Sequence, residues 1–151
     1  MLRICLFLAA GIAALSLRPA LAAGGVDEVI KSATAECAAI DGGILTVGTN
    51  AIQHLDLTGD DIPDALIDGW ELSCSSSHTL FCGGTGGCRI FLVVGHKVRE
   101  EMSKGWELIR FGNMQVLLLQ VHGSACGGTN LRSCVKALVW SDGAFRSIGE
   151  D

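Results

Sequence analysis

The chain has 151 residues, 49% of them hydrophobic, and its 16 acidic and 11 basic side chains give a net charge of −5. Binding to nucleic acid or to an anionic membrane surface requires a basic face, so this acidic balance argues against both as partners. The length is sufficient for one domain with one hydrophobic core.

The first residues have the pattern of a signal peptide. Arg3 precedes an uncharged, mostly apolar run at 4–17, and an Ala-Leu-Ala motif ending at Ala22 is of the kind that signal peptidase cleaves. The run is shorter than the roughly 20 apolar residues of a membrane-spanning helix. We therefore predict a signal peptide at 1–22 and a single disulfide-bonded domain at 23–151, periplasmic or secreted and without membrane attachment after cleavage.

Cleavage leaves six of the seven cysteines: Cys37, Cys74, Cys82, Cys88, Cys126 and Cys134. An even number in an exported chain indicates a disulfide framework, and six cysteines allow 15 pairings. Two pairs bracket short glycine-rich segments, at 82–88 and 126–134, so we expect each pair to close its own loop. Cys37 would then pair with Cys74, although the spacing alone leaves the other pairings open.

A helix is expected near the start of the mature chain. Apolar side chains recur at helical spacing over 26–40, and Asp27 and Glu28 stand in the first turn, where acidic groups favour the helix dipole. A pair of glycines follows as a stop signal. Cys37 lies on the apolar side, in position to join the helix to a sheet.

The rest of the chain is typical of strands and turns. Clusters of Gly, Asp, Asn and Ser separate short apolar runs, and the absence of helical crossover segments favours antiparallel pairing. Strands are expected at 44–47, 65–72, 89–94, 106–111, 115–121, 135–140 and 145–148, and a turn of helix in the polar residues 97–104. We predict an α+β domain in which an N-terminal helix covers one face of an antiparallel, meander-like β-sheet stapled by disulfides.

The segment LDLTGDDIPD, at 55–64, carries oxygen-bearing side chains at alternate positions. Calcium loops have this spacing, with a backbone carbonyl at the seventh position, because a hard cation takes six to eight oxygen ligands. With Asp56 as the first position, the predicted metal ligands are Asp56, Thr58, Asp60, Ile62 through its carbonyl oxygen, and Asp64. The alternative is an acidic turn held by its own hydrogen bonds, with Gly59 and Pro63 shaping the backbone.

The segment resembles the D-x-N-G-D-G-x-x-D loops of EF-hand-like, dockerin-like and FG-GAP or VCBS-type exported proteins. It departs from them at Thr58, where Asn is usual, at Asp61, where Gly is usual, and at Ile67, where an EF-hand has a bidentate Glu. An apolar run follows, as in FG-GAP-type repeats, so an EF-hand pair is not expected. The resemblance implies a single calcium site of weak, extracellular-type affinity.

The chain as a whole resembles a group of small, uncharacterised exported proteobacterial proteins. They share the signal peptide, the acidic loop, a C-G-G-T-G-G-C segment and an H-G-S-x-C-G-G segment, here at 82–88 and 122–128. The resemblance covers most of the mature chain and implies no known activity.

A pattern H-x3-C-G-G-T occurs twice, beginning at His78 and His122, and indicates two hairpins with a cystine loop at each tip. With reduced cysteines the same residues would suit zinc or copper(I), so a periplasmic metal-binding protein is one alternative. The spacing matches no familiar zinc finger, and export favours disulfides.

A small exported hydrolase that uses acidic residues within 56–68 is the other alternative. Ser124 follows His122 closely, but the chain lacks the G-x-S-x-G motif of a nucleophile elbow. Trp70, Trp106 and Trp140 are expected to anchor the core, with a ligand-stacking platform as the alternative. We expect a non-enzymatic binding or interaction module with Ca2+ as its candidate cofactor. The sequence does not identify its partner, for which a protein is one candidate, and the rigid cystine loops are the expected contact surface.

Overall fold

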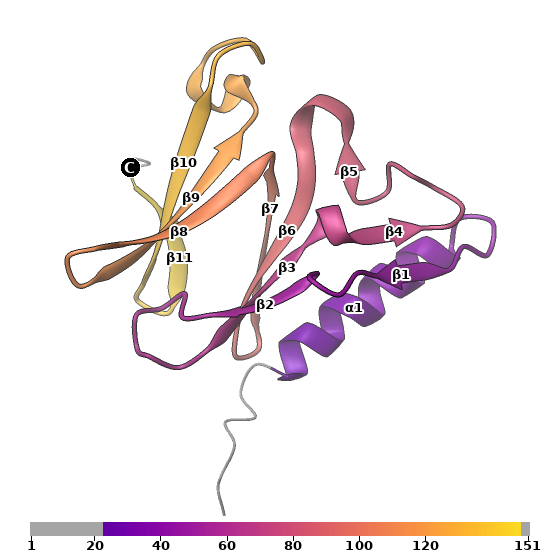
Figure 1. The fold of residues 1–151 in the computed structure, drawn as a ribbon, viewed down its shortest axis with the longest axis horizontal. Helices are drawn as coiled ribbons and strands as arrows, with labels where there is room; N and C mark the ends of the chain where they lie inside the picture. The colour runs from indigo at the N-terminus through magenta and orange to yellow at the C-terminus, as the bar shows by residue number, and fades with distance from the viewer. Residues whose placement is uncertain (1–22, 149–151) are drawn as a thin grey trace, which may run out of the picture.

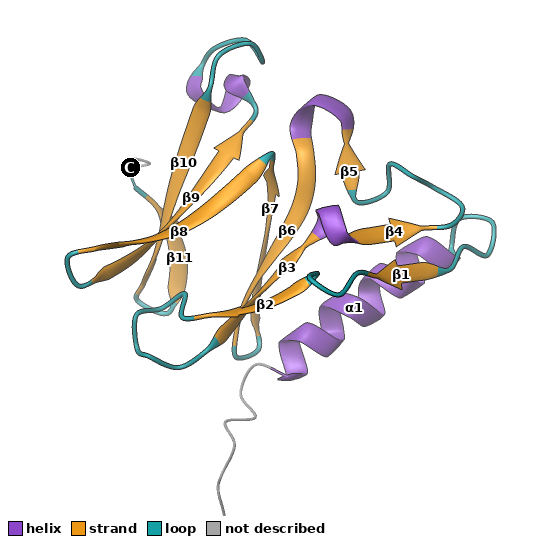
Figure 2. Cartoon of the chain, in the orientation of Figure 1, coloured by secondary structure: helices purple, strands orange, loops and turns teal. Residues whose placement is uncertain are grey.

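The computed structural model describes residues 23–148, and the predicted signal peptide at 1–22 lies outside them. Within these residues one α-helix is followed by antiparallel strands in three sheets (Figures 1 and 2). The expected order, one helix and then antiparallel strands, is confirmed. The described part of the chain contains no helix long and apolar enough to cross a bilayer.

Helix α1 spans Ala23–Ala38. Val29, Ala33 and Cys37 follow one another at intervals of four residues, and all three are buried, so they form the packed stripe of the helix. The helix ends where the backbone N–H of Gly42 donates to the carbonyl oxygen of Ala38 at 3.1 Å, a closing bond that satisfies an otherwise unpaired carbonyl.

The strands are β1 (Leu45–Val47), β2 (Ile52–Leu55), β3 (Asp64–Asp68), β4 (Leu72–Cys74), β5 (Cys82–Gly83), β6 (Gly87–Val94), β7 (Lys97–Ser103), β8 (Gly105–Phe111), β9 (Met114–Val121), β10 (Cys134–Ser141) and β11 (Ala144–Ser147). Three short 3-10 turns interrupt them: η1 (Gly69–Glu71), η2 (Gly84–Gly86) and η3 (Gly123–Cys126).

The strands form a small sheet, a central sheet and an outer sheet. The small sheet is β1-β4, the central sheet is β2-β3-β6-β5 with β7 on the other edge of β6, and the outer sheet is β11-β10-β9-β8. All pairings are antiparallel. Only the outer sheet pairs consecutive strands in order throughout, so the predicted meander describes the C-terminal half of the domain and not the central sheet.

The central sheet lies between α1 and the outer sheet (Figure 1). Successive side chains of a strand point to opposite faces. Ile67 and Phe91 therefore pack with α1, whereas Leu66 and Leu92 pack against the outer sheet, on the side of Leu119. Strand β6 is covered on both faces, which agrees with its almost uninterrupted apolar sequence.

The structure corrects the predicted helical turn at 97–104. These residues form β7, paired with β6 from Val94↔Lys97 to Cys88↔Ser103. The strand is polar because it lies at an edge of the central sheet, where charged side chains discourage pairing with other chains.

The predicted strand at 65–72 is broken after Asp68. The Asp68 carboxylate accepts a hydrogen bond from the backbone N–H of Trp70 at 3.0 Å and caps η1. A side chain at Gly69 would bring its Cβ within 2.3 Å of the Arg89 carbonyl oxygen. The chain therefore turns out of the sheet at this glycine and resumes as β4.

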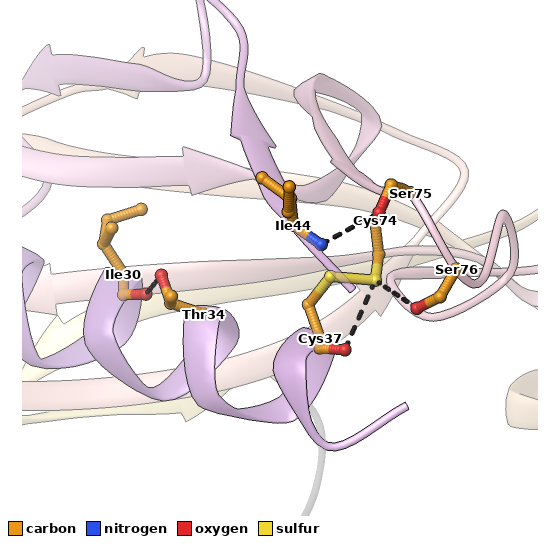
Figure 3. Close-up of a disulfide and its surroundings, with 7 residues drawn as sticks. All are labelled: Ile30, Thr34, Cys37, Ile44, Cys74, Ser75 and Ser76. Carbon is orange, nitrogen blue, oxygen red and sulfur yellow. Dashed lines mark hydrogen bonds between the residues drawn. A yellow bond between two sulfur atoms is a disulfide. The ribbon is translucent and has the colours of Figure 1, made fainter. Parts of the chain in front are cut away.

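Three disulfides join the six cysteines as predicted: Cys37–Cys74, Cys82–Cys88 and Cys126–Cys134. The first ties the C-terminal end of α1 to β4 in a buried position (Figure 3). The other two close the loops between β5 and β6 and between β9 and β10, so both cystine loops lie at hairpin tips. Three disulfides are consistent with an oxidising, exported environment.

A charged bridge reinforces the contact between α1 and the central sheet. The Arg89 guanidinium lies 2.6 Å from a Glu36 carboxylate oxygen on α1 and 2.7 Å from Glu100 on β7. Its hydrogen bond lowers the pKa of Glu36. The same guanidinium lies over the Phe91 ring, 5.1 Å from the centroid, so Arg89 links the helix, β6 and β7.

Candidate functional site

The acidic segment forms the loop between β2 and β3, and Asp56 organises its turn. The Asp56 carboxylate accepts hydrogen bonds from the backbone N–H groups of Gly59 at 2.6 Å and of Asp60 and Asp61 at 3.2 Å. Asp61 has a left-handed φ of 62°. Burial by itself would raise the pKa of Asp56, but these bonds and one from Gln115 outweigh it, and its pKa is lowered.

The other predicted ligands also bond within the loop. The Asp60 carboxylate accepts from the backbone N–H of Ile62 at 2.9 Å, and the Asp64 carboxylate from that of Leu57 at 3.1 Å. Asp64 is buried, with 6% of its surface exposed, while the side chain of Ile62 faces solvent. These bonds are those of the acidic-turn alternative.

The carboxylates of the loop lie close enough to Asp64 to affect its pKa. Burial raises the pKa of Asp64, and the nearby charges of Asp60 and Asp56 raise it further against hydrogen bonds from Leu57 and Thr58. The loop thus holds like charges close enough to repel one another, a repulsion that a bound cation would relieve.

The loop meets part of the donor requirement of a calcium site. Among the described residues, the buried hydroxyl of Thr58 has no hydrogen-bond partner, as expected for an oxygen that could turn to a cation. However, residues 23–148 contain no group of three or more Asp, Glu, His or Cys side chains arranged to hold a metal ion. Asp56 and Asp60 are instead engaged with backbone N–H groups.

A groove of about 470 Å³ lies between η2, in the cystine loop at 82–88, and η3, which leads into the cystine loop at 126–134. The 3-10 turns η2 and η3 lie at the same end of the molecule (Figure 2). Gly86 of η2 and Ala125 of η3 line the groove from its two sides, and Met102 of β7 contributes an apolar side chain that is 40% exposed.

Charged side chains on one wall of the groove are paired with one another. Glu101 on β7 accepts from Arg99 at 2.8 Å and from Lys136 on β10 at 3.1 Å. Arg99 also donates to the carbonyl oxygen of Phe145 at 2.6 Å. This network joins the edge of the central sheet to the outer sheet. It also neutralises the carboxylate of Glu101.

His122 and Ser124, weighed as a hydrolytic pair, cap the turn η3. The backbone N–H of Ser124 donates to Nδ1 of His122 at 3.2 Å, and the two side chains are 2.8 Å apart. Nδ1 of His122 thus accepts the N–H of the turn that it caps. The loop is tightly packed, because a Cβ at Gly123 would come within 1.9 Å of the Thr129 carbonyl oxygen.

The predicted thiolate metal site loses its sulfur ligands, because all six cysteines are in disulfides. His122 is the cap of η3, and His78 is an exposed residue of the connection between β4 and β5. The zinc or copper alternative therefore has only the two histidines left from its proposed ligands.

The acidic residues of the hydrolase alternative are likewise engaged. Besides the bonds of the loop, Asp68 accepts from the indole N–H of Trp106 at 3.0 Å and from the backbone of Trp70. Trp106 and Trp140 pack between the central and outer sheets as expected. Trp70 does not, since it lies on η1 and is 61% exposed, so the prediction that it anchors the core is wrong.

Sequence reasoning did not find the groove residues Met102, Glu101 and Lys136. They come from β7 and β10, and only the stacking of the two sheets brings them together. The alternation of β7, with Arg99, Glu101 and Ser103 on one face, is a signal that could have identified Glu101.

Comparison of the chain with known protein families, with curated proteins and with solved structures finds no match. The likeness to FG-GAP-type loops and to small exported proteobacterial proteins therefore stays a prediction, and no activity is carried over from a relative.

Proposed function

We propose that the protein is an exported, non-enzymatic binding module that holds a protein partner in the groove between its cystine loops. The groove of about 470 Å³ between two disulfide-closed loops is the observation that carries the proposal. Both loops are closed covalently, so little conformational entropy is lost when a partner contacts them.

The chemistry of the groove favours binding over hydrolysis. A hydrolase requires a free base beside its nucleophile. Here Glu101 is neutralised by Arg99 and Lys136, and Nδ1 of His122 receives the N–H of the turn that it caps. Met102 and Val121 add apolar surface, so the groove combines an apolar patch with fixed charges, as protein-binding sites do.

Export is tested by the mass of the protein recovered from the producing cells. The proposal predicts a chain that starts at Ala23, lacks six hydrogens relative to its reduced form and occurs in the periplasm or the medium. An intact chain from Met1 with free thiols in the cytoplasm would contradict it.

The groove is tested by photo-crosslinking in the producing cells. A photoreactive phenylalanine analogue replaces Met102 in the groove, or Val47 on β1 as the control, since the two have similar exposed fractions of 40% and 38%. We expect an adduct with a second protein from position 102 only. Equal adducts from both positions, or none from position 102, would contradict the groove as the binding site.

Calcium at the acidic loop is a second part of the proposal. The unpartnered hydroxyl of Thr58 and the mutual repulsion at Asp64 support it. Millimolar calcium should raise the thermal midpoint of the mature protein relative to a chelator, as expected for weak extracellular sites. Asp60→Asn should abolish this rise, whereas Asp27→Asn on α1 should retain it; equal midpoints with calcium and chelator would reduce the loop to an acidic turn.

A further inference from the structure

The outer sheet has one face that points away from the central sheet and belongs to neither core cluster of residues 23–148. Trp106, Leu108 and Leu117 point to the central sheet, so the alternate residues of the same strands point away from it. The polar outward positions on β8, β9 and β10 are Glu107, Gln120 and Ser141, and Val116 in the middle of the face is buried. The others are apolar apart from Gly105: Ile109, Phe111, Met114, Val116, Leu118, Val135, Ala137 and Val139. Phe111, Val135 and Met114 are exposed by 69%, 59% and 46%.

The composition of this face is that of a buried surface. An antiparallel sheet with one face in water normally alternates apolar and polar residues along each strand. Strand β9 instead has the sequence MQVLLLQV, and β10 continues with VKALVW, in which both faces carry apolar side chains. A contiguous apolar patch of this kind marks an interaction surface.

We propose that a second copy of this chain covers the face. The face carries a projection and a hollow at opposite ends of the same strand. Phe111 projects at the end of β8, where the β8–β9 hairpin extends from the molecule (Figure 1). A hollow of about 440 Å³ lies at the beginning of β8, lined by Gly105, Glu107, Leu118, Gln120, Ser133 and Val135.

The projection and the hollow are self-complementary under a two-fold axis. Strand β8 runs seven residues from Gly105 to Phe111, so the two features are roughly 20 Å apart. A two-fold axis perpendicular to the strands lays one sheet on the other with opposite strand directions. Each Phe111 then enters the hollow of the other copy, which is the symmetric arrangement of an isologous dimer.

The area of the face predicts a weak dimer. Strands β8, β9 and β10 present roughly 350 Å² per copy, below the ~800 Å² per partner of a standard stable interface. Each mature copy has a net charge of −7, from nine basic and sixteen acidic residues, so repulsion opposes association and salt should strengthen it. Val121 and Lys136 of the groove face the central sheet, and the dimer leaves the groove open.

Sedimentation of the mature protein over a range of concentrations tests the dimer. We expect the sedimentation coefficient to rise from that of a monomer toward that of a dimer, and to rise further with salt. Phe111→Asp should weaken association at least about tenfold. Ile44→Asp should associate as the wild type does, because Ile44 is 72% exposed and lies between α1 and β1, outside the outer sheet.

Two outcomes would overturn the proposal: a wild-type protein that stays monomeric at every concentration, and a Phe111→Asp variant that associates as strongly as the wild type. Val135→Asp supplies a second variant at the hollow and should behave like Phe111→Asp. An unchanged thermal midpoint and an intact mass with three disulfides show that each variant is folded.

Discussion

Strand β6 of the central sheet and strand β9 of the outer sheet have similar compositions and different surroundings. Strands β6 (GCRIFLVV) and β9 (MQVLLLQV) are both apolar on both faces. Strand β6 contributes side chains to both core clusters, one with α1 and one with the outer sheet, whereas β9 contributes to a core cluster on one side only. An uninterrupted apolar strand therefore indicates two covered faces, and where the chain supplies one cover the second face is available to a partner.

Removing the Cys37–Cys74 disulfide, which holds α1 over the central sheet, should have the largest effect on the free energy of unfolding. In the chain-entropy picture, the Cys37–Cys74 disulfide, with a sequence separation of 37, stabilises the fold by about 4 kcal/mol, and Cys126–Cys134, with a separation of 8, by about 2.5 kcal/mol. Cys37→Ala/Cys74→Ala should thus lose more stability than Cys126→Ala/Cys134→Ala in urea unfolding. The reverse order would show that α1 is not the principal cover.

Truncating a leucine in each sheet compares the two faces directly. Leu92 is fully buried between the sheets, so Leu92→Ala should cost about 2–5 kcal/mol. Leu118 points to the open face, and Leu118→Ala should cost below about 1 kcal/mol in the dilute monomer. Equal losses in urea unfolding at low protein concentration would mean that the outer face is already covered.

The charged bridge between α1 and the central sheet should have a smaller effect. Glu36 and Glu100 are exposed by 38% and 46%, so water screens their interaction with Arg89. Arg89→Met keeps the apolar stem of the side chain and should lose about 1 kcal/mol. Arg110→Met, which removes the exposed pair with Asp61, is the control and should cost less in the same unfolding assay.

The smallest effect on stability is expected from a substitution of Asp64. This residue ends the acidic loop, whose Leu57 is buried between the two sheets. The pKa of Asp64 is raised in the folded state by burial and by Asp60 and Asp56. Its protonated carboxyl group therefore contributes stability at low pH, and this contribution is lost as the pH rises through that pKa. In chelator, Asp64→Asn should be more stable than the wild type at pH ~7, with the difference vanishing near pH ~4. A wild type that is more stable at pH 7 would contradict the raised pKa.

The sequence predicts those parts of the fold that depend on local signals. The helix follows from apolar spacing and its glycine stop, and the disulfide pairs at 82–88 and 126–134 follow from their proximity along the chain. Strands β6 and β9 follow from their apolar runs.

Local signals fail where long-range pairing determines the structure. Strand β7 is polar because one of its edges is open, and its pairing with β6 overrides its composition. Trp70 is exposed because the chain leaves the sheet at Gly69, where the Arg89 carbonyl lies too close for a side chain. The groove between the cystine loops depends on the stacking of two sheets, which no motif records.

Deuterium uptake of the mature protein at low and high protein concentration tests most directly whether a second copy binds the outward face of the outer sheet. We predict that the backbone amides of β8, β9 and β10 exchange more slowly at high concentration, while those of α1 are unchanged. Exchange that does not depend on concentration, or protection that appears in α1 and not in the outer sheet, would contradict the account.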